Sequence, residues 1–318
     1  MKPSETRLTL WSLGLLLAFP AIPCKAHFDG CDNFNGNSID ASRWSGPVVY
    51  SGVGWLTETN QRLEFTTTNT PTTQDACILQ WNLNPGSYTQ DWELKVDLNI
   101  GMPVFTNASP QPSVHLHLLV SPSNNVSANA IFNVEFGQDA FRYVHTLISS
   151  NGGYAELATK NTPASNLAVR IAFDSGAKVL SAWFDEDAAN CGYSWRPLGS
   201  TVVPASWGMT TNAFSAVLMG IAHNVAVAST NDVFLDNFRA APGSIPRPWI
   251  RHIGNNVAIS WPTNAPGCQL ESTATLTPPV CWAIATNTVT TAGTYFTVTD
   301  TISSQSKFFR LNRNYGCQ

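Results

Sequence analysis

The sequence predicts an all-β protein on three observations. Apolar residues recur at every second position through most of the 318-residue chain, which is the period of a half-buried strand. Clusters of Pro, Gly and Asn separate these alternating stretches. No segment shows a sustained apolar stripe at helical spacing with capping residues at its ends.

Strands are predicted where the alternation is clearest. In chain order these stretches are 55–57, 63–65, 92–98, 114–120, 132–136, 167–173, 178–185 and 214–223. Loops are expected at 102–112, 121–129 and 149–153, where Pro, Gly and Asn gather. Strand-type periodicity therefore extends over nearly the whole of this part of the chain.

Residues 1–26 have the form of a secretory signal. Lys2 and Arg7 give a basic start, residues 11–22 are apolar, and Ala26 is a small residue at the expected cleavage position. The apolar run is short for a membrane span, and no later stretch could cross a bilayer. We therefore expect a mature protein that begins near His27 and is secreted or held at the cell surface.

Charge and cysteine usage narrow the function classes. The formal net charge is −4, which argues against nucleic acid as a partner because that partner requires a basic face. Cys31, Cys77, Cys191, Cys268, Cys281 and Cys317 remain after residue 26, and six cysteines allow fifteen complete pairings. Cys268 and Cys281 flank one predicted turn region and are the preferred disulfide, whereas the pairing of the other four stays open.

Two distant segments are expected to lie together. Residues 32–44 read DNFNGNSIDASRW, and residues 235–240 read LDNFRA. In the strand that contains the second segment, Phe234, Asp236 and Phe238 would share one face. This pair resembles the opening and closing of the concanavalin A-like lectin/glucanase (LamG-like) jelly-roll sandwich of secreted bacterial proteins. The resemblance covers about residues 28–240, implies adjacent first and last strands, and indicates a fold better than an activity.

A second, smaller unit is expected after the sandwich. Residues 241–248 contain three prolines and a glycine, which is typical of a linker, so the first domain is placed at 27–240. Residues 249–318 hold fresh strand patterns. They resemble the C-terminal Ig-like or fibronectin-like β module of many exported bacterial proteins, which is usually a spacer or attachment unit.

A polar face is predicted on the concave sheet of the sandwich. His115, His117, Asn133, Glu135 and Arg170 each lie opposite the apolar alternation of their own strands, so together they would form a hydroxyl-binding surface. Two imidazoles at His115 and His117 could also ligate zinc, with Glu135 or His145 as a third ligand. Trp183 is expected to be exposed on a mixed face, where its ring could stack on a sugar.

Two acidic positions have competing interpretations. Retaining glucanases of the resembled family carry a Glu-x-Asp-x-(x)-Glu strand, and the nearest match is Glu135 with Asp139, in which Gly137 replaces the middle acid. Asp236 matches the position at which some members of that family hold a structural calcium ion. Its alternative role is to accept hydrogen bonds from the amides of the opening loop.

The residues together predict an exported protein that binds a polysaccharide, a cell-surface glycan or another cell-surface ligand without catalysis. A glycoside hydrolase that uses Glu135 is the alternative, because the sequence supplies one carboxylate and no assured second one. A structural surface protein with no small ligand is the third hypothesis. No cofactor is expected beyond the possible calcium ion.

Overall fold

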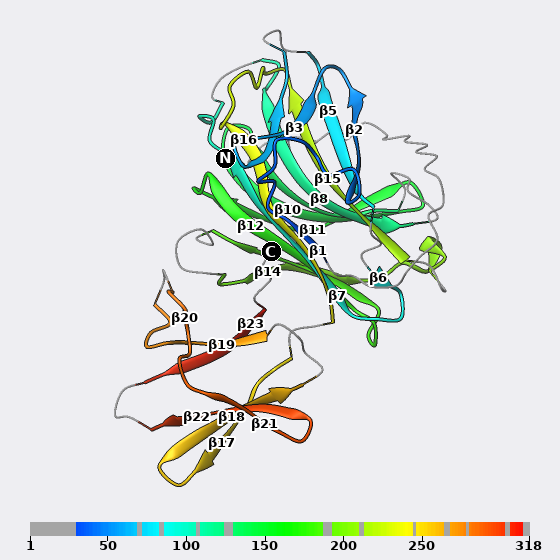
Figure 1. Ribbon diagram of the computed structural model, residues 1–318. Helices are drawn as coiled ribbons and strands as arrows, with labels where there is room; N and C mark the ends of the chain where they lie inside the picture. The colour runs from blue at the N-terminus through cyan, green and yellow to red at the C-terminus, as the bar shows by residue number, and fades with distance from the viewer. Residues whose placement is uncertain are drawn as a thin grey trace, which may run out of the picture.

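The computed structural model describes residues 30–68, 72–82, 86–105, 109–123, 130–186, 193–209, 213–243, 246–263, 268–277, 280–302 and 306–313. The described chain is nearly all β-strand, with one short 3-10 helix, η1 (Ala205–Trp207). Two large antiparallel sheets face each other, and two smaller sheets follow toward the C-terminus (Figure 1). The predicted signal at 1–26 lies outside the described residues. Within the described ranges, no helix has the length and apolar character of a membrane span.

The first large sheet, sheet A, contains eight strands. Its order is β14 (Arg196–Val202), β13 (Val179–Asp185), β12 (Asn166–Asp174), β7 (Trp92–Ile100), β16 (Val233–Pro242), β4 (Arg62–Thr66) and β3 (Trp55–Thr59), and β1 (Gly30–Asp32) also pairs with β16. All of these pairings are antiparallel, and β7 and β16 lie in the middle of the order.

The second large sheet, sheet B, also contains eight strands. Its order is β11 (Gly153–Thr162), β10 (Arg142–Ser150), β9 (Phe132–Gln138), β8 (Ser113–Pro122), β15 (Ala213–His223), β5 (Asp75–Trp81) and β2 (Trp44–Ser51), and β6 (Gly86–Ser87) also pairs with β15. Strands β8, β9 and β10 follow one another in both sequence and space. Polar residues on these three strands therefore become neighbours.

The core lies between the two sheets and uses one residue in two from each strand. Leu94, Val96 and Leu98 of β7 and Leu116 and Leu118 of β8 are fully buried in one cluster. Each such side chain contributes about 1.5–3 kcal/mol by leaving water. The predicted alternation on both strands is confirmed, and it turns the intervening polar residues away from the core.

The opening and closing segments lie side by side, as expected. Gly30 pairs with Ala240 and Asp32 pairs with Phe238, so β1 joins β16 directly. Asp32 is buried, and its carboxylate accepts the amide of Phe34 and the indole N–H of Trp44, each at 2.8 Å. The apolar side chains on both sides of the predicted turn are thereby fixed to the last strand.

The faces predicted for the closing strand are wrong beyond Asp236. Asn237 has φ +50°, and the register with β7 shifts between Asp236 and Arg239, so the strand contains a β-bulge. The extra residue lets Leu235 and Phe238 both enter the core, although they are three positions apart. Strict alternation would have placed Phe238 on the face opposite Leu235.

The smaller unit consists of two sheets with a core of its own. One has the order β17 (Trp249–Ile253), β18 (Asn256–Pro262), β22 (Tyr295–Thr301) and β21 (Val289–Ala292), and the other has β20 (Ala283–Ile284), β19 (Cys268–Thr273) and β23 (Phe308–Arg313). Trp261 and Val298 from the first sheet meet Leu270 and Leu311 from the second. Strand β16 continues through Pro242, two residues into the predicted linker.

The predicted Cys268–Cys281 disulfide is not formed. Strand β19 pairs with β20 so that Ser272 lies opposite Ala283. This register places Cys281 beyond the end of β19 that is far from Cys268. At about 3.3 Å per residue the two positions are roughly 20 Å apart along the hairpin, whereas a disulfide needs Cα atoms within about 7 Å. Cys191 and Cys317 lie outside the described residues.

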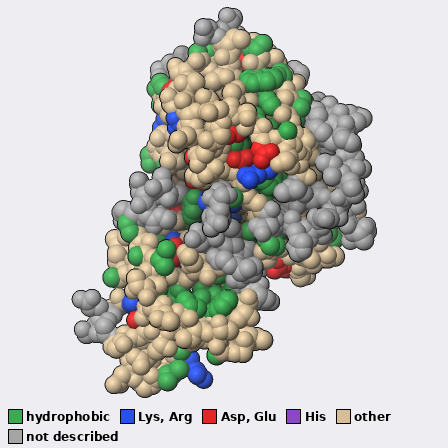
Figure 2. All heavy atoms as spheres, viewed as in Figure 1, with side chains coloured by type: hydrophobic (Ala, Val, Ile, Leu, Met, Phe, Trp, Pro, Cys, Tyr) green, Lys and Arg blue, Asp and Glu red, His purple; other side chains and the backbone are tan. Residues whose placement is uncertain are grey.

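Charged side chains are few on the surface. Figure 2 shows them in small groups among neutral atoms on the face in view. This distribution agrees with a composition in which charged residues make up only 12% of the chain.

Candidate functional site

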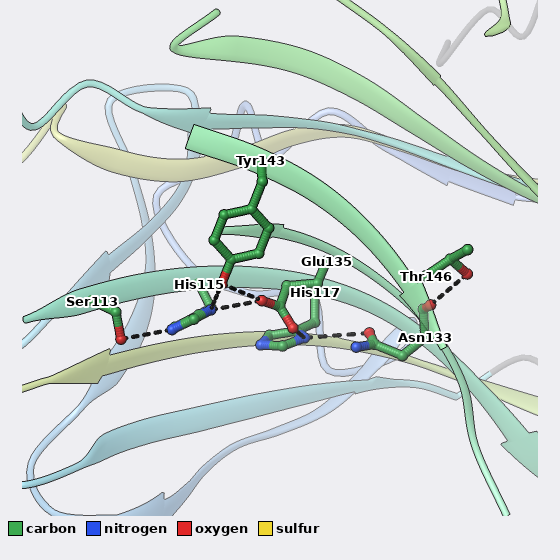
Figure 3. A network of polar contacts seen from close by, with 7 residues as sticks. All are labelled: Ser113, His115, His117, Asn133, Glu135, Tyr143 and Thr146. Carbon is green, nitrogen blue, oxygen red and sulfur yellow. Dashed lines mark hydrogen bonds and ion pairs between the residues drawn. The ribbon is translucent and has the colours of Figure 1, made fainter. Parts of the chain in front are cut away.

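The candidate site lies on the outer face of sheet B, across β8, β9 and β10 (Figure 3). His117 is directly opposite Glu135 on the next strand, and Glu135 is directly opposite His145 on the strand after that. Cross-strand neighbours on one face have Cβ atoms about 5 Å apart. The register alone therefore brings a carboxylate between two imidazoles, and it confirms the predicted grouping of His115, His117, Asn133 and Glu135.

Glu135 is the centre of the polar network. Its Oε1 lies 2.7 Å from Nδ1 of His115 and accepts the hydroxyl of Tyr143 at 3.1 Å. Its Oε2 lies 3.8 Å from Nδ1 of His117. The Glu135 side chain is buried, so all of these interactions act with little screening by water.

Two opposing influences set the pKa of Glu135. Burial is the largest influence and by itself raises that pKa, because it penalises the charged form. The charge of His115 and its hydrogen bond, together with the charges of His117 and His145, outweigh burial, so the pKa of Glu135 lies well below its usual range. The group is therefore a carboxylate at neutral pH, and it accepts hydrogen bonds without donating any.

His117 presents a buried acceptor atom. Its Nδ1 lies 3.2 Å from Oδ1 of Asn133, and a carbonyl oxygen can only accept, so this bond assigns the proton to Nδ1. Burial lowers the pKa of His117 to about 4, so the ring is neutral at pH 7. Nε2 is then an unprotonated acceptor, and it is buried with no hydrogen-bond partner in the described part of the chain. A buried polar atom without a partner is costly and calls for a donor.

His115 connects the network to the edge of the site. Its Nε2 lies 2.7 Å from Oγ of Ser113, the first residue of β8, and its Nδ1 meets Glu135. Ser113 and His115 share a face because they are two positions apart on one strand. The ring of His115 is also 5.7 Å from that of His223, which lies edge-on to it and binds the carbonyl of Thr73 at 3.1 Å.

Tyr143 reaches the carboxylate because of a glycine on the neighbouring strand. Gly137 is directly opposite Tyr143, and a Cβ at Gly137 would lie 2.5 Å from the Tyr143 ring. The absence of that atom lets the ring lie across β9. Burial, followed by the charge of Glu135, raises the pKa of Tyr143, so its hydroxyl stays protonated and acts as a donor.

A buried apolar cluster adjoins the polar network on the same face of sheet B. Met219 and Ile221 of β15 lie opposite His117 and His115. With Ala76, Ile78, Leu119 and Val217 they form a buried cluster. The outer face of sheet B thus combines fixed hydrogen-bonding groups with apolar area, which is the usual composition of a site for a small ligand.

Arg170 does not belong to this face, and that part of the prediction is wrong. Arg170 lies on β12 in sheet A, so its outward side is the opposite surface of the sandwich. There it pairs with Glu93 at 2.5 Å and its guanidinium lies 4.7 Å from the centre of the Trp183 ring. Trp183 is half-buried under this cation, and it too is separated from the histidines by the core.

Asp236 does not bind the opening loop. Its carboxylate accepts the amide of Asn237 at 2.7 Å, and it lies opposite Asp97 on β7. Burial, with the charge of Asp97 also contributing, raises the pKa of Asp236 to about 6. The role proposed for it in the opening loop is filled by Asp32 instead.

The described residues contain no group of three His, Cys, Asp or Glu side chains that could hold a metal ion. At the predicted zinc position, each Nδ1 is directed at a side chain: that of His115 at Glu135 and that of His117 at Asn133. The two rings are stacked, with centroids 6.1 Å apart.

Sequence reasoning missed Ser113 and Tyr143. Ser113 had a signal, because it continues the every-second-residue series that includes His115 and His117. Tyr143 had none in its own strand, since its role depends on the β9–β10 register and on the space above Gly137.

Comparisons with known proteins give only distant likenesses. No family model and no curated protein matches the chain. Among solved structures, lectin I-B4 from Griffonia simplicifolia in its metal-free form is 15% identical, with 66% of this chain and 98% of that chain covered and a TM-score of 0.42. Lectin II from Ulex europaeus is 10% identical, with 68% and 100% covered and a TM-score of 0.42.

A mutant of the GH43 protein BlXynB from Bacillus licheniformis is 12% identical, with 66% of this chain and 38% of that chain covered and a TM-score of 0.42. All three TM-scores are below 0.5, so the function of the site is argued from its own residues.

Proposed function

We propose that the protein is secreted and binds a carbohydrate on the outer face of sheet B, in keeping with the concanavalin A-like resemblance. The observation that carries the proposal is the buried Nε2 of His117, an acceptor with no partner among the described residues. A sugar hydroxyl that displaced the groups covering this atom would donate to it and regain the hydrogen bond that burial removes.

The neighbours of His117 suit the same ligand. Glu135 is an ionised acceptor held in place by His115 and Tyr143, so little ordering is needed when a hydroxyl binds. Val48, Tyr50 and Ile131, which are partly buried and pack against the apolar cluster, offer apolar area to the C–H face of a sugar ring. A ligand that is polar at its edge and apolar on its face matches this combination better than a purely apolar ligand does.

A glycoside hydrolase is the less favoured hypothesis. A general acid needs a carboxyl group with a raised pKa. The pKa of Glu135 is lowered instead, and the side chains that contact its carboxylate are those of His115, His117 and Tyr143. Glu135 therefore suits the work of an acceptor.

The test is a glycan array with the exported protein, followed by titration of any glycan that binds. His117→Phe keeps a ring and removes the acceptor, and we expect it to weaken binding about 5- to 150-fold, from about 1–3 kcal/mol for an unmet hydrogen bond. His252→Phe, at an exposed position on β17, is the matched control and should bind as wild type does.

Two results would contradict the proposal. Equal affinity in His117→Phe and wild type would show that the glycan binds elsewhere, and an array without binding would favour the structural-protein hypothesis. If wild type releases reducing sugar from a bound glycan and Glu135→Gln does not, the hydrolase is correct. A binding site should keep most of its affinity in Glu135→Gln.

A further inference from the structure

Ser113, His115 and Glu135 form one continuous chain of hydrogen bonds across β8 and β9. The Ser113 hydroxyl lies 2.7 Å from Nε2 of His115, and the opposite ring nitrogen, Nδ1, lies 2.7 Å from Oε1 of Glu135. A hydroxyl, an imidazole and a carboxylate in this order and at these distances are the parts of an activated serine nucleophile. We infer that Ser113 is the nucleophile of an ester-hydrolysing site, with His115 as general base and Glu135 as the residue that positions the base.

The direction of the hydrogen bonds agrees with this inference. Glu135 is ionised and can only accept, so the proton on His115 that faces it resides on Nδ1. In the neutral ring, Nε2 is then the basic nitrogen, and it faces the Ser113 hydroxyl. This is the tautomer in which imidazole can take the proton of a serine.

Solvent exposure falls along the chain of hydrogen bonds from Ser113 to Glu135, which is the order that such a site needs. Ser113 is partly exposed at the start of β8, and the His115 side chain is 12% exposed. The Glu135 side chain is 8% exposed. A substrate can thus reach the hydroxyl while the carboxylate stays sheltered from water, where its hydrogen bond to the imidazole is strongest.

Tyr143 and the strand pairing hold the geometry in place. The Tyr143 hydroxyl donates to the same Oε1 that receives His115, which fixes the carboxylate from a second side. Ser113 and His115 lie on β8, Glu135 lies on β9, and Tyr143 lies on β10, and these three strands are consecutive in sheet B. Sites built on strands keep their geometry better than sites on loops.

The reaction balances with water as the only co-reactant. Oγ of Ser113 bonds to the ester carbonyl carbon while its proton passes to Nε2 of His115, and the carbonyl electron pair moves onto oxygen. When that pair returns, the carbon–oxygen bond to the alcohol breaks and the alcohol leaves with the proton from Nε2. Water then repeats the two steps on the acyl-serine, which releases the acid and restores Ser113.

The substrate class is an acyl ester carried by a sugar, and this assignment rests on the proposed carbohydrate site. Ser113 lies four residues from His117 on the same face of the same strand. A sugar hydroxyl at Nε2 of His117 and an acyl group on the same glycan could therefore occupy one continuous surface.

The first experiment tests the nucleophile alone and needs no ligand. The exported wild-type protein is treated with a fluorophosphonate, which phosphonylates activated serines, and is then analysed by intact mass and peptide mapping. One adduct is expected, on Ser113. Ser113→Ala should take no adduct. Ser51→Ala should be labelled as wild type is, because Ser51 is also half-buried but its hydroxyl binds the backbone carbonyl of Gln74.

The second experiment measures turnover of para-nitrophenyl acetate and acetate release from acetylated xylo-oligosaccharides. Glu135→Gln should lower both rates about 10³- to 10⁴-fold, as loss of the positioning carboxylate does in serine hydrolases. Glu135→Asp should recover part of that loss, which a merely structural role would not predict.

The outcomes separate this inference from the carbohydrate proposal. Folded wild-type protein without an adduct on Ser113 overturns the nucleophile, whether or not glycan binding is found. An adduct on Ser113 with no glycan binding supports the nucleophile and contradicts the carbohydrate site. Turnover of para-nitrophenyl acetate without acetate release from the acetylated xylo-oligosaccharides overturns the assigned substrate class. Acetate release that Ser113→Ala abolishes while it keeps glycan affinity supports both.

Discussion

Asp236→Asn should stabilise the protein at neutral pH. Asp236 lies opposite Asp97 on the neighbouring strand, and its pKa in the folded protein is about 6 because of burial, with the charge of Asp97 also contributing. In the unfolded chain the same group has the ordinary value of 3.8. Ionising it above pH 6 therefore disfavours the folded state, and asparagine removes the charge while keeping the shape.

The magnitude follows from the two pKa values. The difference between 3.8 and about 6 corresponds to about 3 kcal/mol, at about 1.4 kcal/mol for each pKa unit. Asp236 retains some contact with water, which reduces the expected gain to about 1–2 kcal/mol. Asn in place of Asp can still accept the amide of Asn237, so little is lost on that side.

The prediction can be tested through the pH dependence of the free energy of unfolding. A raised folded-state pKa means that the folded protein binds the proton more tightly, so this group makes the wild type lose stability as pH rises from about 4 to about 6. Urea unfolding of wild type and Asp236→Asn at several pH values should give equal stabilities near pH 3.5 and a difference that grows and levels off above pH 6.5. Wild type and variant share the charged groups that face Asp236, namely Asp97, Lys95, Arg62 and Arg239. The titration of these groups therefore contributes to both stability curves, and the difference between the curves reports on Asp236.

A calcium ion at Asp236 would reverse the result. Asp236→Asn would then be less stable than wild type in calcium, and a chelator would lower the melting temperature of wild type without changing that of the variant. Either observation would refute the argument from burial and establish the calcium site that the family resemblance implies.

Two further changes test the packing that supports the site and the opening loop. Gly137→Ala places a Cβ 2.5 Å from the Tyr143 ring. It should therefore cost about 1–3 kcal/mol by overpacking, and an unchanged urea midpoint would show that the ring can move aside freely. Asp32→Ala leaves the buried N–H groups of Phe34 and Trp44 without their acceptor. It should cost about 2–5 kcal/mol, and a loss below 0.5 kcal/mol, the range of an ordinary surface change, would contradict the anchoring role.

The alternation of residues predicted which side chains share a strand face better than it predicted which sheet each strand joins. Period-two spacing placed His115 with His117 and Asn133 with Glu135, and the structure confirms both faces. The same spacing could not show which sheet a strand joins, because both sheets turn apolar residues inward. For that reason Arg170 was assigned to the wrong surface.

Local irregularities were beyond a pattern that assumes regular strands. The bulge at Asn237 adds one residue to the closing strand and exchanges the faces that follow it. The same limit applies to Cys268 and Cys281. Their closeness in sequence does not determine how the two strands of the hairpin pair, and the observed register separates them. Tyr143 reaches the site because its ring lies over Gly137 on the neighbouring strand. That contact depends on the strand register, which the sequence pattern does not show.

The pairing of β1 with β16 has a consequence for rearranging the chain. Gly30 and Ala240 are direct neighbours in sheet A, so the polypeptide enters and leaves the large sandwich at adjacent points. A few residues could join these two ends without crossing the core, and new termini could be opened at the turn that contains Asn151 and Gly152. The large sandwich is therefore a natural candidate for circular permutation and for insertion as a unit into a loop of another protein.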